Sequence, residues 1–135
     1  MAAEGGCLCG ETRFAIEGAI GKAGYCHCED CRRVTGSAFN ISVPVEIASF
    51  RLLSGRLGSF TKFSDSGHEL TRYFCQTCGS PIYAAAPKHP SKIYVKAGCL
   101  DDATVISPEL EAWCRSRVSW SKIPENLQQY ELGRS

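Results

Sequence analysis

Seven of the nine cysteines in this chain fall into three short clusters, which constrain the fold more than any other feature. The clusters are Cys7 and Cys9, then Cys26, Cys28 and Cys31, then Cys75 and Cys78. Thiols so close together are poorly placed to cross-link a core by disulfides, and an odd number of cysteines leaves one of them unpaired. In a reducing compartment, clustered cysteines are typically metal ligands or redox groups. We therefore expect the chain to fold around bound metal.

The sequence gives no sign of export, membrane insertion or nucleic-acid binding. Residues 1–6 contain neither a basic segment nor an apolar run, and no stretch has the length of a membrane span. A net charge of +1 gives no general attraction to nucleic acids or lipid surfaces. We expect a cytoplasmic protein with one domain over residues 1–135. The sequence leaves the oligomeric state open, and a homodimer is compatible with it.

Short alternating segments separated by turn residues predict a mostly β fold. The expected strands are 12–16, 39–43, 50–53, 60–63, 70–74, 81–85, 93–97 and 113–120. Segments 60–63 and 70–74 predict a hairpin with its turn at 64–67, and 81–85 and 93–97 predict a second pair. Pro44 is expected to end its strand or to mark a sheet edge. Residues 29–35 predict a short helix that ends at Gly36, and 124–130 predict a helical turn.

The outer two clusters predict one closed zinc site. Cys7, Cys9, Cys75 and Cys78 supply the four thiolates that structural zinc prefers, and glycines flank both pairs. A shared ion would tie the N-terminal loop to a late hairpin. The alternatives are a redox pair at 75–78 or buried cysteines without a ligand.

The central cluster predicts a second site with one coordination position open. Cys26, Cys28 and Cys31 leave zinc one ligand short, and a water or substrate group can complete the set. A thiol substrate suits such a site because the metal lowers its pKa and holds it as thiolate. Arg32 and Arg33 follow directly and are expected to pair with a carboxylate of the ligand.

The remaining cysteines and the histidines are expected to have other roles. His27 lies between two predicted ligands, but extended backbone would point its side chain away from them. It is therefore expected to support the site or to lie at the surface. His68 and His89 read as solvated loop residues. Cys99 and Cys114 have no close partner and read as small buried hydrophobic residues.

The cysteine motifs together resemble the glutathione-dependent formaldehyde-activating enzyme family, also called the centromere protein V-like family. The matching segments are Gly6-x-Cys7-x-Cys9-Gly10, Cys26-His27-Cys28-x-x-Cys31-Arg32-Arg33-x-x-Gly36-Ser37 and Phe74-Cys75-x-x-Cys78-Gly79-Ser80. The resemblance extends from about Gly5 to Trp120. It implies a small zinc-stabilised β-tent of short antiparallel sheets. It also implies that Cys7, Cys9, Cys75 and Cys78 bind structural zinc, and that Cys26, Cys28 and Cys31 bind catalytic zinc.

The activity that the resemblance implies is the condensation of glutathione with formaldehyde, which belongs to carbon–sulfur lyase chemistry. The chain departs from the family pattern at Glu111, where a histidine often precedes the late aromatic, here Trp113. If this position lines the pocket, the ligand is expected to differ from that of the type member.

Three hypotheses about function follow from these patterns. The first is a zinc-dependent enzyme that acts on a small thiol such as glutathione and on an aldehyde or its thiol adduct. The second is a non-catalytic zinc module that recognises a protein partner. The third is a redox enzyme like methionine sulfoxide reductase B, which would need Cys99 or Cys114 exposed with a lowered pKa. The resemblance favours the first.

Overall fold

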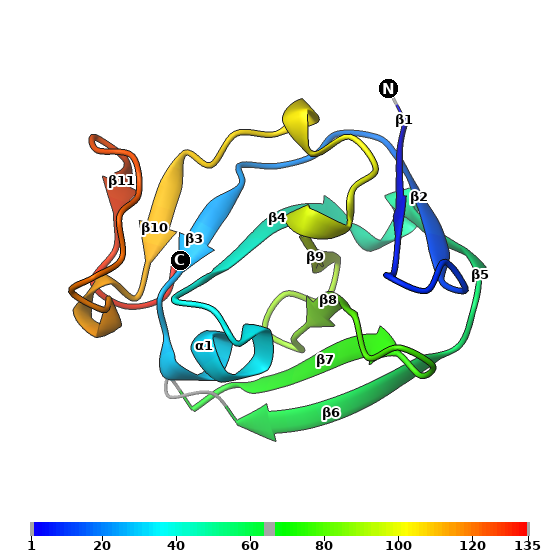
Figure 1. Ribbon diagram of the computed structural model, residues 1–135, viewed down its shortest axis with the longest axis horizontal. Helices are drawn as coiled ribbons and strands as arrows, with labels where there is room; N and C mark the ends of the chain where they lie inside the picture. The colour runs from blue at the N-terminus through cyan, green and yellow to red at the C-terminus, as the bar shows by residue number, and fades with distance from the viewer. Residues whose placement is uncertain (1, 64–66, 135) are drawn as a thin grey trace.

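The strands of this computed structural model, which describes residues 2–63 and 67–134, form two sheets (Figure 1). The smaller sheet has the order β1-β2-β5 and the larger sheet the order β11-β10-β3-β4-β9-β8-β7-β6. The smaller sheet consists of β1 (Ala2–Gly6), β2 (Arg13–Glu17) and β5 (Phe50–Ser54). The larger sheet consists of β3 (Gly24–Cys26), β4 (Asn40–Glu46), β6 (Leu57–Phe63), β7 (Glu69–Cys75), β8 (Pro81–Ala85), β9 (Lys92–Lys96), β10 (Leu110–Ala112) and β11 (Gln128–Gln129). The predicted mostly β fold is confirmed.

A single α-helix, α1 (Glu29–Thr35), occurs within the described residues, and it coincides with the predicted one. Gly36 ends it in the left-handed conformation, with φ of 69°, and its N–H donates to the carbonyl of Arg32. Short 3₁₀ turns occupy Ile47–Ser49, Ala97–Cys99, Ala103–Val105 and Cys114–Ser116. Across residues 2–63 and 67–134, no helix has the length and hydropathy needed to cross a membrane.

Both predicted strand pairs are present. β6 and β7 form an antiparallel hairpin, and β8 pairs with β9 in the same way. The predicted turn at 64–67 lies largely outside the described residues, at Ser64, Asp65 and Ser66.

One end of the larger sheet departs from the antiparallel pairing that was expected and found elsewhere. β10 runs parallel to both β3 and β11, as Figure 1 shows. No strand forms at 113–120, where one was predicted. β10 ends at Ala112, because Trp113 adopts a left-handed backbone with φ of 57° and turns the chain. The helical turn predicted at 124–130 is also wrong. The free edge of β10 accepts a strand there, with Tyr130 N donating to Glu111 O at 2.9 Å.

Pro44 lies inside β4, although it was expected to end the strand or to mark an edge. β4 has β3 on one side and β9 on the other. The carbonyl of Pro44 accepts from the N–H of Gly21, 2.9 Å away. In a strand the N–H and C=O of one residue point to the same side, so the donor that proline lacks would face Gly21. The hydrogen bonds between β4 and β9 are therefore kept.

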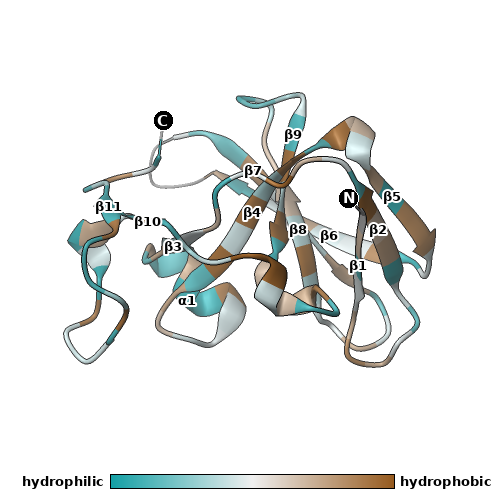
Figure 2. Cartoon of the chain, turned by 90° about the horizontal axis from the view of Figure 1, so that it is seen from above, coloured by the Kyte–Doolittle hydropathy of each residue, from teal (hydrophilic) through white to brown (hydrophobic). Residues whose placement is uncertain are grey.

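Alternation along the central strands separates the core from a polar face, and the change in hydropathy along β4 can be followed in Figure 2. The core contains Phe14, Ile16, Ala23, Val43, Val45, Ile82, Ile93, Val95 and Leu100. Asn40 and Ser42 alternate with the core residues of β4. The strand register places Asn40 beside Cys26 of β3 and Ser42 beside Lys96 of β9. The polar face therefore carries one of the cysteine clusters.

Candidate metal centres and cavity

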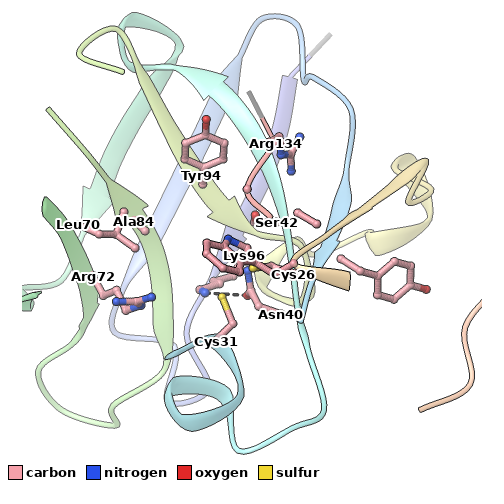
Figure 3. Close-up of a pocket in the computed structure, with 14 residues that line it drawn as sticks. Cys26, Cys31, Asn40, Ser42, Leu70, Arg72, Ala84, Tyr94, Lys96 and Arg134 are labelled. Atoms are coloured by element: carbon pink, nitrogen blue, oxygen red, sulfur yellow. Dashed lines mark hydrogen bonds between the residues drawn. The ribbon is translucent and has the colours of Figure 1, made fainter. Parts of the chain in front are cut away.

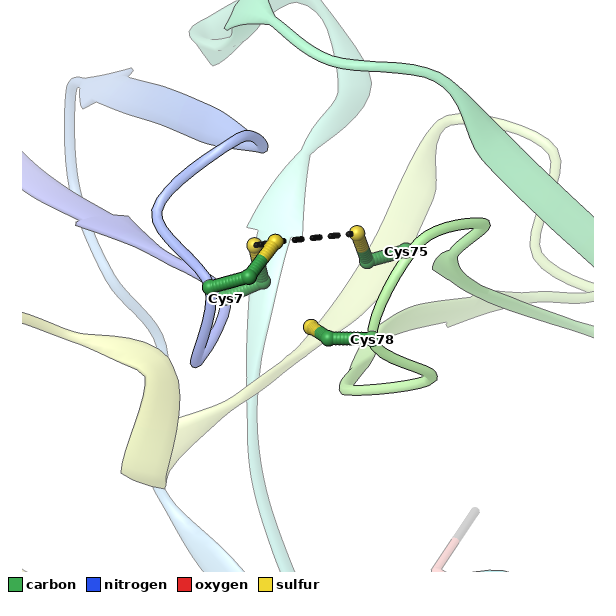
Figure 4. Close-up of side chains that lie close together, drawn as sticks. Cys7, Cys75 and Cys78 are labelled. Carbon is green, nitrogen blue, oxygen red and sulfur yellow. Dashed lines mark hydrogen bonds between the residues drawn. The ribbon is translucent and has the colours of Figure 1, made fainter.

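The outer cysteine pairs come together where the loop after β1 meets the turn between β7 and β8 (Figure 4). The four sulfur atoms of Cys7, Cys9, Cys75 and Cys78 all lie within 4.8 Å of one another. The Sγ atoms of Cys7 and Cys9 are 3.5 Å apart, and those of Cys9 and Cys75 are 3.9 Å apart. Tetrahedral zinc with Zn–S bonds of about 2.3 Å would separate its sulfurs by roughly 3.8 Å. This four-cysteine group could hold a metal ion.

Local donors orient the sulfurs of the four-cysteine group. Thr12 N donates to Cys7 Sγ at 3.2 Å, and the Ser80 hydroxyl lies 3.3 Å from Cys78 Sγ. Ser80 Oγ also accepts from Leu8 N at 3.0 Å, which links the two loops. Hydrogen bonds from the hydroxyl and the backbone of Ser80 lower the pKa of Cys78 to about 5. Ser80 therefore favours the thiolate form of Cys78, the form that metal ions bind.

Cys26, Cys28 and Cys31 form a second group, the three-cysteine group, with sulfurs again within 4.8 Å of one another. Cys26 ends β3, Cys28 caps the N-terminus of α1, and Cys31 lies buried in the first turn. Cys31 N donates to Cys28 Sγ at 3.3 Å. Close contact with the other two thiols lowers the pKa of Cys28, and contact with Cys28 raises the pKa of Cys26. A bound cation would let all three ionise.

Two adjoining cavities open at the three-cysteine group, with volumes of about 320 Å³ and 150 Å³. Both contact Cys26, Cys31, Leu70, Arg72, Tyr94, Trp113, Gly133 and Arg134. The larger one also reaches Cys28, Lys88, His68 and His89. The smaller one, drawn in Figure 3, reaches Asn40 and Lys96 on the polar face of the sheet. Neither cavity touches the four-cysteine group, so the two groups differ in their access to a ligand.

Three cations line the smaller cavity, each on a separate segment. Arg72 comes from β7 and Lys96 from β9, whereas Arg134 follows β11 near the C-terminus. Lys96 is buried, and its Nζ donates to Asn40 Oδ1 at 2.7 Å. Burial lowers the pKa of Lys96, and the nearby thiolate of Cys31 opposes that shift. Arg134 lies over the ring of Tyr94, with 5.7 Å from Cζ to the ring centroid.

The predicted arginines lie away from these cavities. Neither Arg32 nor Arg33 contacts the two cavities at the three-cysteine group. Arg33 instead pairs with Glu29, one turn away on α1, at 3.1 Å. A contact of either arginine with a ligand carboxylate stays a prediction.

The structure also places the other residues singled out from the sequence. His68 and His89 line the larger cavity. His27 is fully buried and contacts Glu111, so the expected surface position is wrong and a supporting role remains. Cys99 and Cys114 are half-buried and belong to neither sulfur group, and burial raises the pKa of both. Those raised pKa values weaken the redox hypothesis.

Sequence reasoning missed the cavity cations Arg72, Lys96 and Arg134. A partial signal existed for Lys96, because alternation with Val95 places it opposite the core. The alternation does not say that α1 and the C-terminal segment enclose that face.

Comparisons with known proteins cover most of this chain. The family model described as glutathione-dependent formaldehyde-activating enzyme matches residues 2–116, which include both cysteine groups. Among solved structures, the chain is similar to a Rhodobacter sphaeroides protein known from a crystal structure, with 22% sequence identity and a TM-score of 0.59. That similarity covers 73% of this chain and 87% of the other, and it shows a shared fold.

Proposed function

Because this chain belongs to the glutathione-dependent formaldehyde-activating enzyme family, we propose that it joins a small thiol to an aldehyde, or cleaves their adduct. Glutathione and formaldehyde are the substrates that the family suggests, and the chemistry is that of a carbon–sulfur lyase. The observation that carries the proposal is the three-cysteine group, which opens on two cavities lined by cations. The four-cysteine group touches neither cavity and is assigned a structural role.

The donor sets of both groups suit zinc. Four thiolates complete a structural site, whereas three leave one position for a ligand. Zinc held by Cys26, Cys28 and Cys31 would lower the pKa of an incoming thiol and favour its thiolate.

The cavity cations supply the charge balance that this chemistry requires. Three thiolates and one divalent cation leave one excess negative charge, and a thiolate substrate adds another. Lys96 is the buried cation nearest the sheet face that carries Cys26, and its charge offsets this excess. Arg72 and Arg134, on the walls of both cavities, are assigned to the carboxylates of the thiol.

Formation of the adduct makes a C–S bond and an O–H bond, and it breaks the S–H bond of the thiol and the π bond of the C=O group. The thiolate sulfur attacks the aldehyde carbon, and the π electrons of the C=O bond move to its oxygen. The proton that the thiol released on ionising returns through solvent to that oxygen, which gives the hydroxyl of the adduct. The reverse sequence releases thiol and aldehyde. Lys96 is assigned to stabilise the negative oxygen before it is protonated.

We expect freshly purified, reduced protein to contain two zinc ions per chain, because the sulfurs divide into one group of four and one of three. Elemental analysis after purification without chelators measures this. The three-cysteine group is expected to release its zinc first during dialysis against a chelator, because it offers one ligand fewer. A zinc content near zero would contradict the metal assignment of both groups.

Arg72→Ala is expected to weaken glutathione binding by about 1–3 kcal/mol, the scale of one charge-assisted hydrogen bond. Isothermal titration calorimetry of the zinc-loaded protein measures it, and the difference should shrink as salt rises. Arg51→Ala is the matched control, because Arg51 pairs with Glu17 on the smaller sheet and is 61% exposed.

Turnover on glutathione with formaldehyde, compared with other thiol–aldehyde pairs, tests the proposed activity itself. Equal affinity in wild type and Arg72→Ala would remove the assigned role of Arg72. The absence of turnover with every pair in a protein that carries two zinc ions would favour the non-catalytic binding module.

A further inference from the structure

A buried histidine and a buried glutamate meet directly behind the three-cysteine group. His27 lies between Cys26 and Cys28 in sequence, and its side chain is completely buried. Its Nε2 atom lies 3.0 Å from Oε1 of Glu111, whose side chain is 2% exposed. Glu111 belongs to β10, which runs parallel to β3 and pairs with it up to Cys26. The contact therefore joins the segment that bears the thiols to the last strands of the chain.

Glu111 is held from its other side by the C-terminal part of the chain. Gln129 of β11 donates from Nε2 to Oε2 at 3.1 Å, and Arg117 Nη1 lies 3.7 Å from Oε1. Burial alone would raise the pKa of Glu111, but the hydrogen bonds from Gln129 and His27 outweigh it and lower that pKa. The carboxylate is thus ionised and fixed in position.

His27 has no second polar contact for its ring. Within residues 2–63 and 67–134, its Nδ1 atom is buried and has no hydrogen-bond partner. The ring otherwise meets aromatic side chains, with centroids 6.4 Å from Tyr25 and 6.1 Å from Phe39. Removing the carboxylate of Glu111 would leave a buried imidazole without any hydrogen bond, so nothing polar would fix the orientation of the ring.

We propose that Glu111 is a positioning residue for metal binding by Cys26, Cys28 and Cys31, and that it acts through His27. The backbone of His27 is fixed as well, because its N–H donates to Ala112 O at 3.0 Å. With ring and backbone both held by β10, the directions of the flanking Cys26 and Cys28 side chains are set before metal arrives. The four-cysteine group shares no residue with this network. The inference rests on metal binding by the three-cysteine group and not on the proposed reaction.

Cobalt(II) titration followed by thiolate-to-cobalt absorption tests this proposal without any substrate. The reduced full-length chain, dialysed against a chelator until the four-cysteine group alone keeps its zinc, is compared with Glu111→Ala, and Cys28→Ser identifies the signal of the three-cysteine group. We expect Glu111→Ala to lower the cobalt affinity of that group 10–100-fold, the range for partners of metal ligands, and to leave the zinc content of the four-cysteine group unchanged. Glu111→Gln keeps an oxygen that can accept from His27 and should restore most of the affinity. Glu109→Ala, an exposed position just before β10, is the matched control.

A second variant separates positioning from general destabilisation and serves if Glu111→Ala folds poorly. His27→Phe keeps an aromatic ring in the site but removes the ring nitrogen that contacts Glu111. His27→Phe should lower the cobalt affinity of the three-cysteine group by a similar factor. The double variant should lower it no further, because both changes break the same interaction. Wild-type cobalt affinity in His27→Phe would overturn the proposal. Loss of zinc from the four-cysteine group alongside the loss of cobalt affinity would also overturn it. The absence of a three-cysteine cobalt signal in wild type would do the same.

Discussion

Replacing Cys78 by serine is expected to unfold the domain at physiological temperature or to lower its melting temperature strongly. Cys78 belongs to the four-cysteine group, which joins the loop after β1 to the turn between β7 and β8. Metal binding at such sites contributes roughly 10 kcal/mol or more to folding in small zinc modules. Whole domains are stable by only about 5–15 kcal/mol. The loss of one thiolate therefore removes a term comparable with the total stability.

Thermal melts of zinc-loaded wild type and Cys78→Ser, with zinc counted before each melt, measure this effect. Cys99→Ser is the control, because Cys99 is half-buried and lies outside both sulfur groups. Its Sγ donates to the carbonyl of Pro81, a bond that a serine hydroxyl can also make. A Cys78→Ser protein that melts within a few degrees of the control would show that the four-cysteine group does not stabilise the fold.

The parts of the fold that the sequence predicts are those specified by neighbouring residues. The β6–β7 and β8–β9 pairs connect adjacent segments, and helix α1 ends at the glycine that permits a left-handed backbone. β3 and β10 have three residues each, too few for a periodic signal. Their parallel pairing joins distant parts of the chain, so no local pattern could indicate it.

The candidate site divides in the same way. The cysteine clusters predicted the two groups, because three thiols on one short segment suit one ion and the two outer pairs together supply the four thiolates that structural zinc prefers. The cavity cations come from three distant parts of the chain: the order of the strands brings β7 with Arg72 near β9 with Lys96, and the segment after β11 adds Arg134. Proximity in sequence favoured Arg32 and Arg33, but neither lines the two cavities, and the side chain of Arg33 pairs with Glu29 along the helix surface. The contact of His27 with Glu111 depends on the parallel pairing of β10, which the sequence did not indicate.

Cys28→Ser is expected to leave the fold intact while it removes metal from the three-cysteine group. Cys26, Cys28 and Cys31 lie on one continuous segment, so a metal there closes no long loop. The backbone of β3 is held independently by β4 and β10. Serine can also keep the helix cap, since its hydroxyl can accept from Cys31 N, the bond that Cys28 Sγ accepts at 3.3 Å.

Cys28→Ser is expected to lose most of its turnover while it keeps most of its thermal stability. Loss of a direct metal ligand should cost more than the 10–100-fold typical of outer partners, so kcat/KM is expected to fall at least about 100-fold. The measurements are zinc content, a thermal melt and kcat/KM on the best thiol–aldehyde pair, made on one preparation beside Cys78→Ser. Retained activity with one zinc ion per chain would place the chemistry away from the three-cysteine group. Unfolding as severe as in Cys78→Ser would make that group structural, because a catalytic site confined to one segment has no distant elements to hold together.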